Sequence, residues 1–481
     1  MNIKCFLYLF YLFINSILFL VKGFGFIPIK FGNQINIRNQ INNNNEISKT
    51  ILLNKESESF INKIDGFFGM IGPDVSIPIP KNMINLFDLF SKNGVLQGVF
   101  ISNGTIHFVR KYIKTEKWLY EERFGEIPIH PLTLFLFEIG NKFKMLPNIF
   151  GLANTALLNY QNKVYVLNER DLPYEIEVNF LKRDIQTKQK LNLGPKIHHF
   201  LAHSKINKKG NLIETLDYSI FSKKINWFQF DKNWNIKKQI QINKKYISMV
   251  HDFISLENHI LFIDSPLKME YDLKNRISFQ LSKDLKQEES SSLLIIEKAT
   301  GNKKIIDLGE NTFLFHYGNS FENEKVIEFY GCFYDSFDFK TPKKNSGKFR
   351  KVIVYKNKGT AEIIQNTVLE NFSLDFPVFY KNYTILTHSL DSKNKNFIIV
   401  NNFELHKVIE LDNKYINGEA SVIEIDGKPY LICFTYKETT IANVLEHYLC
   451  LYGIETNDST SILIPFNLTF GFHSIFLKTF F

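Results

Sequence analysis

The sequence predicts an all-β fold built from many short antiparallel strands. From Gly66 onward, stretches rich in Ile, Val, Phe, Tyr and Thr recur at intervals of roughly 10–15 residues, and polar turns separate them. Long amphipathic helical patterns are scarce over the same stretch. Many hairpins with no helical repeat between them indicate a sandwich, a barrel or a propeller.

Three hairpins carry the clearest signals. In each, two β-rich stretches flank a pair of central residues, and a type I′ turn requires positive φ at both of these positions, which favours Asn, Asp and Gly. The central pairs are Asn103-Gly104, Gln161-Asn162 and Asp426-Gly427. The predicted strand pairs are 94–101 with 105–112, 157–160 with 163–167, and 422–425 with 429–435.

The first residues have the character of targeting segments. Lys4 followed by the apolar run 5–21 predicts a signal peptide over residues 1–23. Residues 24–62 are polar and rich in Asn, which predicts a transit-like leader or a disordered linker before a β body at 63–481. This two-part leader resembles those of proteins sent to plastids of secondary origin, so we expect a plastid location. A simple secretory signal and a retained membrane anchor are the alternatives.

Composition narrows the classes of partner. The chain is 44% hydrophobic and 22% charged, which is typical of a globular protein with a large core. Its net charge of +9 comes without a basic cluster interleaved with aromatics, so it favours weak attraction to anionic membranes and not nucleic-acid binding. The 47 Phe fit an AT-rich coding bias, a Phe-lined tunnel, or both. Cys332, Cys433 and Cys450 are far apart and lack a CxxC pattern, so we expect buried free thiols.

Four histidines stand in similar local settings, each after a small or apolar residue: His203, His251, His316 and His473. They are separated by 48, 65 and 157 residues, so no helix or hairpin can bring them together. A propeller can, because the innermost strand of every blade lines one central channel. Neutral imidazole binds Fe, Cu, Zn and Ni. The sequence therefore predicts one metal site with open positions for O2 or water.

Around these histidines the chain resembles the carotenoid cleavage oxygenase family, also described as carotenoid/retinal pigment oxygenases. The matching phrases stand in the order of the family, from about Gly66 to the C-terminus. They are Asn154-Thr155-Ala156-Leu157, Asn168-Glu169-Arg170-Asp171, Ala202-His203-Ser204-Lys205, Met249-Val250-His251-Asp252-Phe253, Phe315-His316-Tyr317, Gly418-Glu419-Ala420 and Gly471-Phe472-His473.

The resemblance implies a seven-bladed β-propeller with a dome of loops and short helices over an Fe(II) site. The four histidines would bind the iron, Glu169, Glu419 and Asp375 would accept their second N–H groups, and Thr155 would screen one open position. Asp375 stands where the family has Glu, and one methylene less leaves its carboxylate about 1.5 Å short. Either the backbone moves in, or a water bridges, or that histidine is held loosely.

The resemblance also implies an activity, which is O2-dependent cleavage of a carotenoid or apocarotenoid double bond to aldehyde or ketone products. Isomerohydrolase action, stilbene cleavage and a catalytically reduced carotenoid-binding propeller are the alternatives. Carotenoids dissolve in bilayers, so we expect peripheral membrane contact, and residues 132–152 are either an interfacial patch or dome core. Gln97 replaces a histidine of the family's first blade, so substrate contacts in that blade are expected to differ.

Overall fold

The computed structural model describes residues 46–53, 55–77, 79, 85–127, 131–142, 144–219, 222–271, 277–281, 290–387, 395–441 and 444–479. Its compact unit begins at Glu46. The strands of the described residues form eight antiparallel sheets, and the helices are short. The all-β prediction is confirmed.

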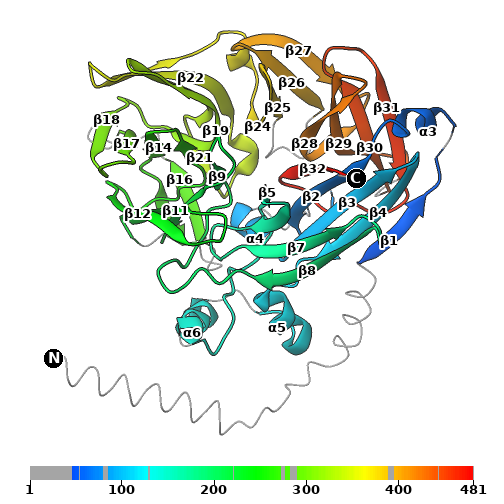
Figure 1. Cartoon of the computed structure of the whole chain (residues 1–481), viewed down its shortest axis with the longest axis horizontal. Helices are drawn as coiled ribbons and strands as arrows, with labels where there is room; N and C mark the ends of the chain where they lie inside the picture. Colours follow the sequence, from blue (N-terminus) through cyan, green and yellow to red (C-terminus); the bar gives the residue numbers. More distant parts are fainter. Residues whose placement is uncertain are drawn as a thin grey trace, which may run out of the picture. The chain divides into compact units, whose positions relative to one another are not determined.

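Seven of these sheets have four or five strands, and Figure 1 shows them following one another around a common centre. The sheet that joins the two ends of the unit is β1(Ile47–Ile51)-β4(Thr105–Tyr112)-β3(Gly94–Ser102)-β2(Gly66–Pro73)-β32(Ser474–Lys478). The next three are β5(Ala156–Tyr160) to β8(Asp184–Lys190) through β6(Lys163–Leu167) and β7(Tyr174–Asn179); β9(Lys205–Ile206), β10(Ile213–Tyr218), β11(Lys224–Phe230) and β12(Ile236–Asn243); and β13(Ile254–Ser255), β14(His259–Asp264), β17(Ser292–Glu297) and β18(Lys303–Asp307). The last three are β19(Phe313–Glu322), β20(Val326–Tyr334), β22(Gly347–Tyr355) and β23(Thr360–Ile364); β24(Asp375–Tyr380), β25(Tyr383–Thr387), β26(Asn396–Asn401) and β27(Glu404–Glu410); and β28(Tyr415–Ile425), β29(Lys428–Glu438), β30(Leu445–Gly453) and β31(Ser459–Ile464).

The remaining sheet has three strands and is built from segments inserted between the others. Its strands are β15(Lys268–Tyr271), β16(Ile277–Leu281) and β21(Phe337–Asp338). Among the described residues the helices are α3(Lys55–Ile61), α4(Leu86–Phe90), α5(Glu116–Phe124) and α6(Pro131–Lys142), with 3-10 turns η2(Pro342–Lys344) and η3(Leu369–Asn371). No helix within the described ranges is long and apolar enough to cross a membrane.

The turn chemistry predicted from the sequence is confirmed. Asn103 and Gly104 have φ values of 48° and 67° between β3 and β4, and Asp426 and Gly427 have 52° and 75° between β28 and β29. These are the positive values that a type I′ turn requires. The hairpins therefore form where their turn residues predicted them.

The ring closes by pairing the last strand with the first sheet. β32 pairs with β2 in antiparallel register, from Gly66 opposite Lys478 to Met70 opposite Ser474. The C-terminal segment is thereby fixed at the inner side of the ring, beside β2, which is buried along its whole length. A strand buried on both faces lies inside a fold, so this pairing places His473 near the centre.

The predicted start of the β body at residue 63 is too late. β1 lies inside the segment 24–62 that we expected to be leader or linker, and it pairs with β4 from Ile47 opposite Arg110 to Ile51 opposite Ile106. Its residues are mostly exposed except Ile51, as for an edge strand, so apolar alternation did not reveal it. The predicted signal peptide and residues 24–45 lie outside the described residues.

The three cysteines of the β body are free and buried, as predicted. Cys433 and Cys450 face each other on β29 and β30, and Cys332 lies on β20. Each packs in an apolar cluster, and polar groups also contact two of them: Cys332 interacts with the Asp375 carboxylate, and Cys450 contacts the hydroxyls of Thr435 and Ser461. They belong to the packed core.

Candidate metal centre

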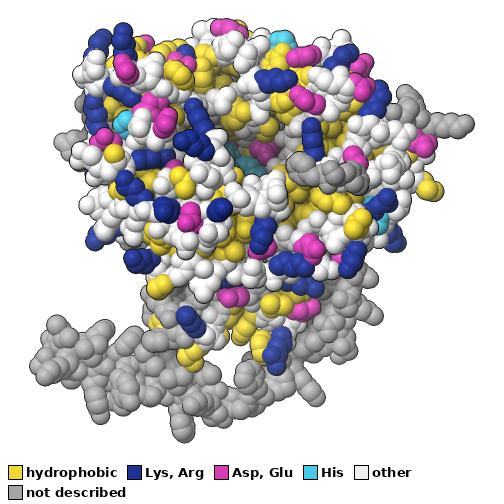
Figure 2. Space-filling model, in the orientation of Figure 1, with side chains coloured by type: hydrophobic (Ala, Val, Ile, Leu, Met, Phe, Trp, Pro, Cys, Tyr) yellow, Lys and Arg dark blue, Asp and Glu magenta, His cyan; other side chains and the backbone are white. Residues whose placement is uncertain are grey.

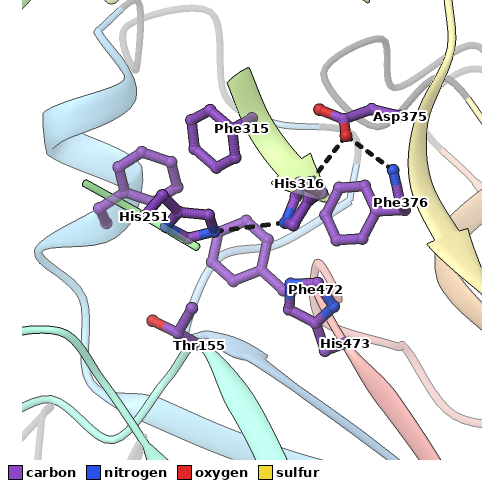
Figure 3. Close-up of a pocket in the computed structure, with 9 residues that line it drawn as sticks. Thr155, His251, Phe315, His316, Asp375, Phe376, Phe472 and His473 are labelled. Atoms are coloured by element: carbon purple, nitrogen blue, oxygen red, sulfur yellow. Dashed lines mark hydrogen bonds and ion pairs between the residues drawn. The ribbon is translucent and has the colours of Figure 1, made fainter. Parts of the chain in front are cut away.

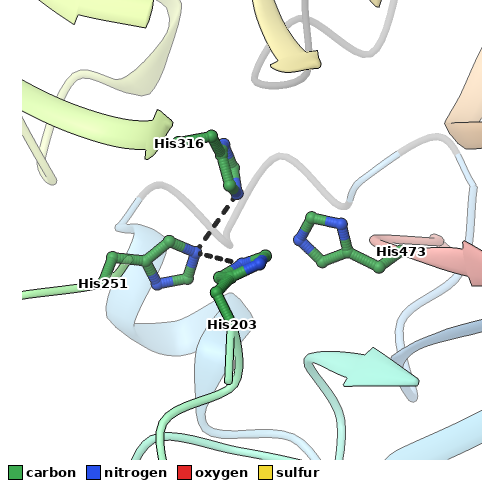
Figure 4. Close-up of side chains that lie close together, drawn as sticks. All are labelled: His203, His251, His316 and His473. Atoms are coloured by element: carbon green, nitrogen blue, oxygen red, sulfur yellow. Dashed lines mark hydrogen bonds between the residues drawn. The ribbon is translucent and has the colours of Figure 1, made fainter. Parts of the chain in front are cut away.

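The inner strands bring all four predicted ligands together. His203 lies two residues before β9, His251 three residues before β13, His316 within β19, and His473 directly before β32. Figure 4 shows the four rings converging from these separate segments. One nitrogen of each ring lies within 4.8 Å of those of the other three. Nitrogens that each lie about 2 Å from one central ion are at most about 4 Å apart, so this spacing is close to that of a coordination site.

The positions of the ring protons indicate that the four histidines can bind a cation. Carboxylates face Nδ1 of His251 and Nδ1 of His316, each at 2.7 Å, and we therefore assign the ring protons to Nδ1. The opposite nitrogens, Nε2 of His251 and Nε2 of His316, lie 3.2 Å apart and present lone pairs to each other. Nε2 of His203 lies 3.0 Å from Nε2 of His251. Converging lone pairs repel each other, and a positive ion bound by them removes that repulsion.

Burial keeps at least two of the imidazoles in the form that binds metals. Burial, and after it the neighbouring imidazoles, holds the pKa of His203 well below its usual value of 6.5. Burial also lowers the pKa of His316, although Asp375 opposes the shift. A neutral ring has the free lone pair that a metal takes. Both rings can therefore ligate at neutral pH.

Glu169 and Glu419 contact their histidines as the resemblance implied. Oε1 of Glu169 lies 2.7 Å from Nδ1 of His251, which carries the ring proton, although this N–H is not well aligned on the oxygen. Burial alone raises the pKa of Glu169, but His251 outweighs it and the pKa is below its usual range. Oε1 of Glu419 lies 3.3 Å from Nδ1 of His473, and the N–H of Ser474 donates to Oε2 at 3.0 Å. Each carboxylate thus fixes the orientation of one ring.

Two glycines allow the segments of Glu419 and His473 to approach each other. A Cβ on Gly471 would lie 1.9 Å from the sulfur of Met70. Gly418 has a φ of 76°, and a Cβ there would lie 2.8 Å from the same sulfur. A side chain at position 471 would have to displace the buried Met70 side chain, and one at position 418 would also meet the Gly471 backbone at 2.9 Å. This is the physical reason for the glycines in the Gly418-Glu419 and Gly471-Phe472-His473 phrases.

Asp375 contacts His316 directly, without a bridging water. Of the three outcomes that the sequence left open, the structure fits the one in which the backbone at Asp375 lies closer to the histidine. Oδ1 of Asp375 accepts from Nδ1 of His316 at 2.7 Å and from the N–H of Phe376 at 2.9 Å. Phe376 has a φ of 52°, a left-handed conformation that bulky residues rarely adopt, and the β24–β25 register is broken between Asp375 and Val378. Burial raises the pKa of Asp375, but His316 and further hydrogen bonds outweigh it and the pKa is below its usual range. The histidine is therefore not loosely held.

An apolar chamber adjoins the histidines and includes Thr155. It is lined by Phe90, Thr155, His251, Phe315, His316, Asp375, Phe376, Phe472 and His473, most of which Figure 3 labels. The hydroxyl of Thr155 donates to the Asn154 amide oxygen at 3.0 Å, which leaves its methyl group for the chamber. The Phe315 ring lies 4.1 Å from that of His251, and the Phe376 ring lies 4.6 Å from that of His473, centroid to centroid. Figure 2 shows a hollow near the centre of this face, with a histidine and an acidic side chain visible in it.

Polar contacts that the sequence did not predict connect the three segments that carry His203, His251 and His316. Oδ1 of Asp252 accepts from Nζ of Lys205 at 2.6 Å, and Oδ2 accepts from the N–H of Tyr317 at 2.9 Å. Asp252 is 3% exposed. Each of the three residues lies within two positions of a ligand histidine. Their only sequence signal was membership of the quoted phrases, which gave them no role.

Gln97 holds the C-terminal segment, and it is not among the residues that line the chamber. Its Nε2 donates to the carbonyl of Thr469 at 2.7 Å, and the N–H of Thr469 donates to Oε1 at 3.0 Å. Asn417 adds a contact from Nδ2 to the same carbonyl at 2.9 Å and accepts from the N–H of Gly471. These side chains fix the backbone that leads to His473. Gln97 therefore has a structural role, and the expectation that substrate contacts in this blade differ stays a prediction.

The other histidines that the structure describes lie outside the cluster. Nδ1 of His199, four residues before His203, contacts Oδ1 of Asp217 at 2.9 Å. His447 is 3% exposed and lies on β30, where it pairs with Ile464 of β31. The choice of the Ala202-His203 phrase over the His198-His199 doublet is consistent with this geometry.

Together, a closed ring of antiparallel sheets and a buried four-imidazole centre with three carboxylates define an all-β protein with a four-histidine metal site. The chain belongs to the family described as retinal pigment epithelial membrane protein, whose model matches residues 62–391. The family resemblance found in the sequence phrases is thereby confirmed.

Known relatives and solved structures agree with this assignment. The carotenoid 9,10(9′,10′)-cleavage dioxygenase 1 of Arabidopsis thaliana is 24% identical over 478 residues, covering 86% of this chain and 84% of the relative. The carotenoid 9,10(9′,10′)-cleavage dioxygenase of Crocus sativus is 23% identical over 479 residues with the same coverage. A variant of Synechocystis apocarotenoid oxygenase superimposes with a TM-score of 0.69 at 15% identity, over 90% of this chain and 96% of that chain. The cobalt-substituted form of the Synechocystis enzyme gives 0.68 at 16% identity with the same coverage.

Proposed function

We propose that this protein is a non-haem Fe(II) dioxygenase that cleaves a carbon–carbon double bond of a carotenoid or apocarotenoid with O2, giving aldehyde or ketone products. The observation that carries the proposal is the buried cluster of four imidazoles beside a phenylalanine-lined chamber. The names of the relatives support the substrate class. An intact ligand set with three contacting carboxylates favours an enzyme over a catalytically reduced binding protein.

The residues of the chain would divide the work as follows. Nε2 of the four histidines would hold the iron, which when bound supplies the activation of O2. Glu169, Asp375 and Glu419 keep the rings oriented, and the carboxylates of the last two also accept a backbone N–H group, from Phe376 and Ser474 respectively. The phenylalanine rings exclude water and offer apolar contacts to a polyene. The Thr155 methyl group would narrow access to one side of the metal.

The finer architecture is also part of the proposal. The seven sheets of four or five strands would be the blades of a seven-bladed propeller, and the three-stranded sheet with α4 would form part of a dome over the centre. Two features support this: the order of the seven sheets around the ring in Figure 1, and the position of α4, whose Phe90 lines the chamber. The likeness to apocarotenoid oxygenase points the same way.

Peripheral membrane contact would use the region around α5 and α6. Leu119 and Phe124 are each 50% exposed and Met145 is 66% exposed, with basic Arg123 and Lys144 beside them. Exposed apolar groups flanked by basic residues are typical of interfacial segments. Ile149 is buried, so part of the predicted segment 132–152 is core. For the leader we retain the plastid proposal, which a fluorescent reporter carrying residues 1–45 would test.

The test of the function is expression in carotenoid-accumulating bacteria. We expect bleaching of the cells, release of aldehydes or ketones identified by mass spectrometry, and about one iron per chain in the purified protein. His251→Ala should abolish both iron binding and cleavage with the fold retained, because a large β core does not depend on its metal as a zinc finger does. Iron at wild-type stoichiometry in that variant would contradict the ligand assignment. Intact carotenoids beside an iron-loaded protein would contradict the substrate class.

A further inference from the structure

Asp375 is held from two sides, and the second contact comes from a residue in another sheet. Oδ1 faces His316, as described above, while the hydroxyl of Tyr334 donates to Oδ2. Tyr334 is the last residue of β20, lies 41 positions before Asp375 and is 2% exposed. Its ring packs edge-on against Phe337 at 5.3 Å between centroids. The phenol therefore has one fixed position, directed at the carboxylate.

A glycine creates the space that this contact needs. Tyr334 pairs with Gly347 across β20 and β22, and the carbonyl of Gly347 accepts from the N–H of Leu374 at 2.7 Å. A Cβ on Gly347 would lie 2.3 Å from the Leu374 carbonyl oxygen, 3.0 Å from Cζ of Tyr334 and 3.1 Å from its hydroxyl oxygen. The residue before Asp375 and the phenol thus meet at a position where only glycine fits.

We propose that Tyr334 is a positioning residue of the metal centre, whose hydroxyl compensates for the short side chain of Asp375 and orients His316 through it. This inference rests on the proposed metal site. A shorter carboxylate leaves a gap on the side away from the histidine, and the phenol fills it together with the Cys332 thiol, which also interacts with Asp375. With both oxygens occupied, the carboxylate cannot rotate, and Nδ1 of His316 keeps its acceptor and its Nε2 lone pair stays aimed at the other imidazoles.

The proposal predicts that the residues at positions 334 and 375 act as a matched pair. Tyr334→Phe removes the donor on Oδ2 and should weaken Co²⁺ binding about tenfold, the low end of effects from residues that support ligands. Asp375→Glu adds a methylene that pushes the carboxylate about 1.5 Å into occupied space, so it should also weaken binding. The double variant removes the hydroxyl and supplies the longer side chain. It should bind Co²⁺ more tightly than either single variant.

The experiment uses the full-length protein stripped of metal and titrated with Co²⁺ against a chelator, with the visible absorption spectrum of bound cobalt as a second measurement. Tyr330→Phe is the matched control: it lies on the same strand, and its hydroxyl donates to Glu328 at 3.1 Å, away from the centre. Thermal unfolding with and without Co²⁺ separates the roles. A merely structural tyrosine would lower both midpoints equally, whereas a positioning residue reduces the shift that the metal causes.

The outcomes are distinguishable. Weaker Co²⁺ binding and an altered cobalt spectrum in Tyr334→Phe, recovery in the double variant and no change in Tyr330→Phe would support the proposal. Unchanged Co²⁺ affinity in Tyr334→Phe would overturn it. If Tyr334→Phe does not fold, Asp375→Glu still decides, because binding as tight as wild type would show that the space is not occupied. A wild-type protein that binds no Co²⁺ would instead overturn the metal site on which the proposal rests.

Discussion

Replacing Asp252 by Asn should loosen three metal ligands at once. The Asp252 carboxylate accepts from Lys205 on one oxygen and from the N–H of Tyr317 on the other. An amide of the same shape keeps one acceptor, but its NH₂ group must face either the Lys205 ammonium or the Tyr317 N–H, and both are donors. The segments that carry His203 and His316 would therefore separate from the one that carries His251.

The size of the effect follows from these contacts. A hydrogen bond to a charged group contributes about 1.5–3 kcal/mol, and a buried donor left without an acceptor costs about 1–3 kcal/mol. The Lys205 side chain is 30% exposed, so water recovers part of the loss. We expect about 2–3 kcal/mol less stability, which for a unit of this size lowers the unfolding midpoint by about 2–3 °C. Metal affinity should fall at least about tenfold.

Circular dichroism during heating and Co²⁺ titration measure the two effects in the Asp252→Asn protein. Lys205→Met is the informative comparison, because it removes the ion pair but leaves the acceptor for Tyr317. Its loss of metal affinity should be smaller than that of Asp252→Asn. Wild-type Co²⁺ affinity in Asp252→Asn, or a larger loss in Lys205→Met, would refute the reasoning.

Three further predictions concern the rest of the fold. Burial lowers the pKa of His447 to about 4, so the folded state keeps this ring neutral while the unfolded chain takes up a proton below its usual 6.5. About 3 kcal/mol of stability is therefore present above pH 6.5 and lost as the pH falls towards 4, and urea denaturation at several pH values should show less of this loss in His447→Leu. Gln97→Met leaves the N–H of Thr469 without an acceptor, so it should lower the free energy of unfolding by about 2–3 kcal/mol and weaken Co²⁺ binding through His473. An unchanged urea midpoint would contradict the role of Gln97 in holding the C-terminal segment. A chain beginning at Glu46 should fold, whereas one beginning at Ser59 lacks β1 and should aggregate or melt at lower temperature, because the edge of β4 is exposed.

Two kinds of sequence feature predicted most of the fold and the site: pairs of adjacent turn residues, and the order of the motif phrases along the chain. The type I′ turns formed where Asn-Gly and Asp-Gly stood, because that signal depends on two adjacent residues. The four clustered histidines were identified because each lies inside a recognisable phrase, and in a closed ring the order of the phrases is sufficient without knowledge of the distances. Glu169 and Glu419 were found in the same way. The structure then placed them against His251 and His473.

Contacts between segments far apart in the sequence could not be predicted. Gln97 and Thr469 are 372 residues apart, and nothing near Gln97 indicates that its amide pairs with a backbone rather than with substrate. β1 could not be predicted for a different reason. An exposed edge strand needs no alternation of apolar residues, so its sequence resembles that of a polar linker.

The case of Asp375 shows why a substitution within a motif cannot be judged by side-chain length alone. From the sequence, one missing methylene implied a weakened contact with His316. The contact is nevertheless direct, because the position of a carboxylate is set by the backbone that carries it and by the groups that fill the space behind it. Here the left-handed Phe376 and the register break move the backbone, while Tyr334 and Gly347 close the gap from a neighbouring sheet. The space around Asp375 is shaped for the shorter side chain, so Asp375→Glu alone should weaken metal binding.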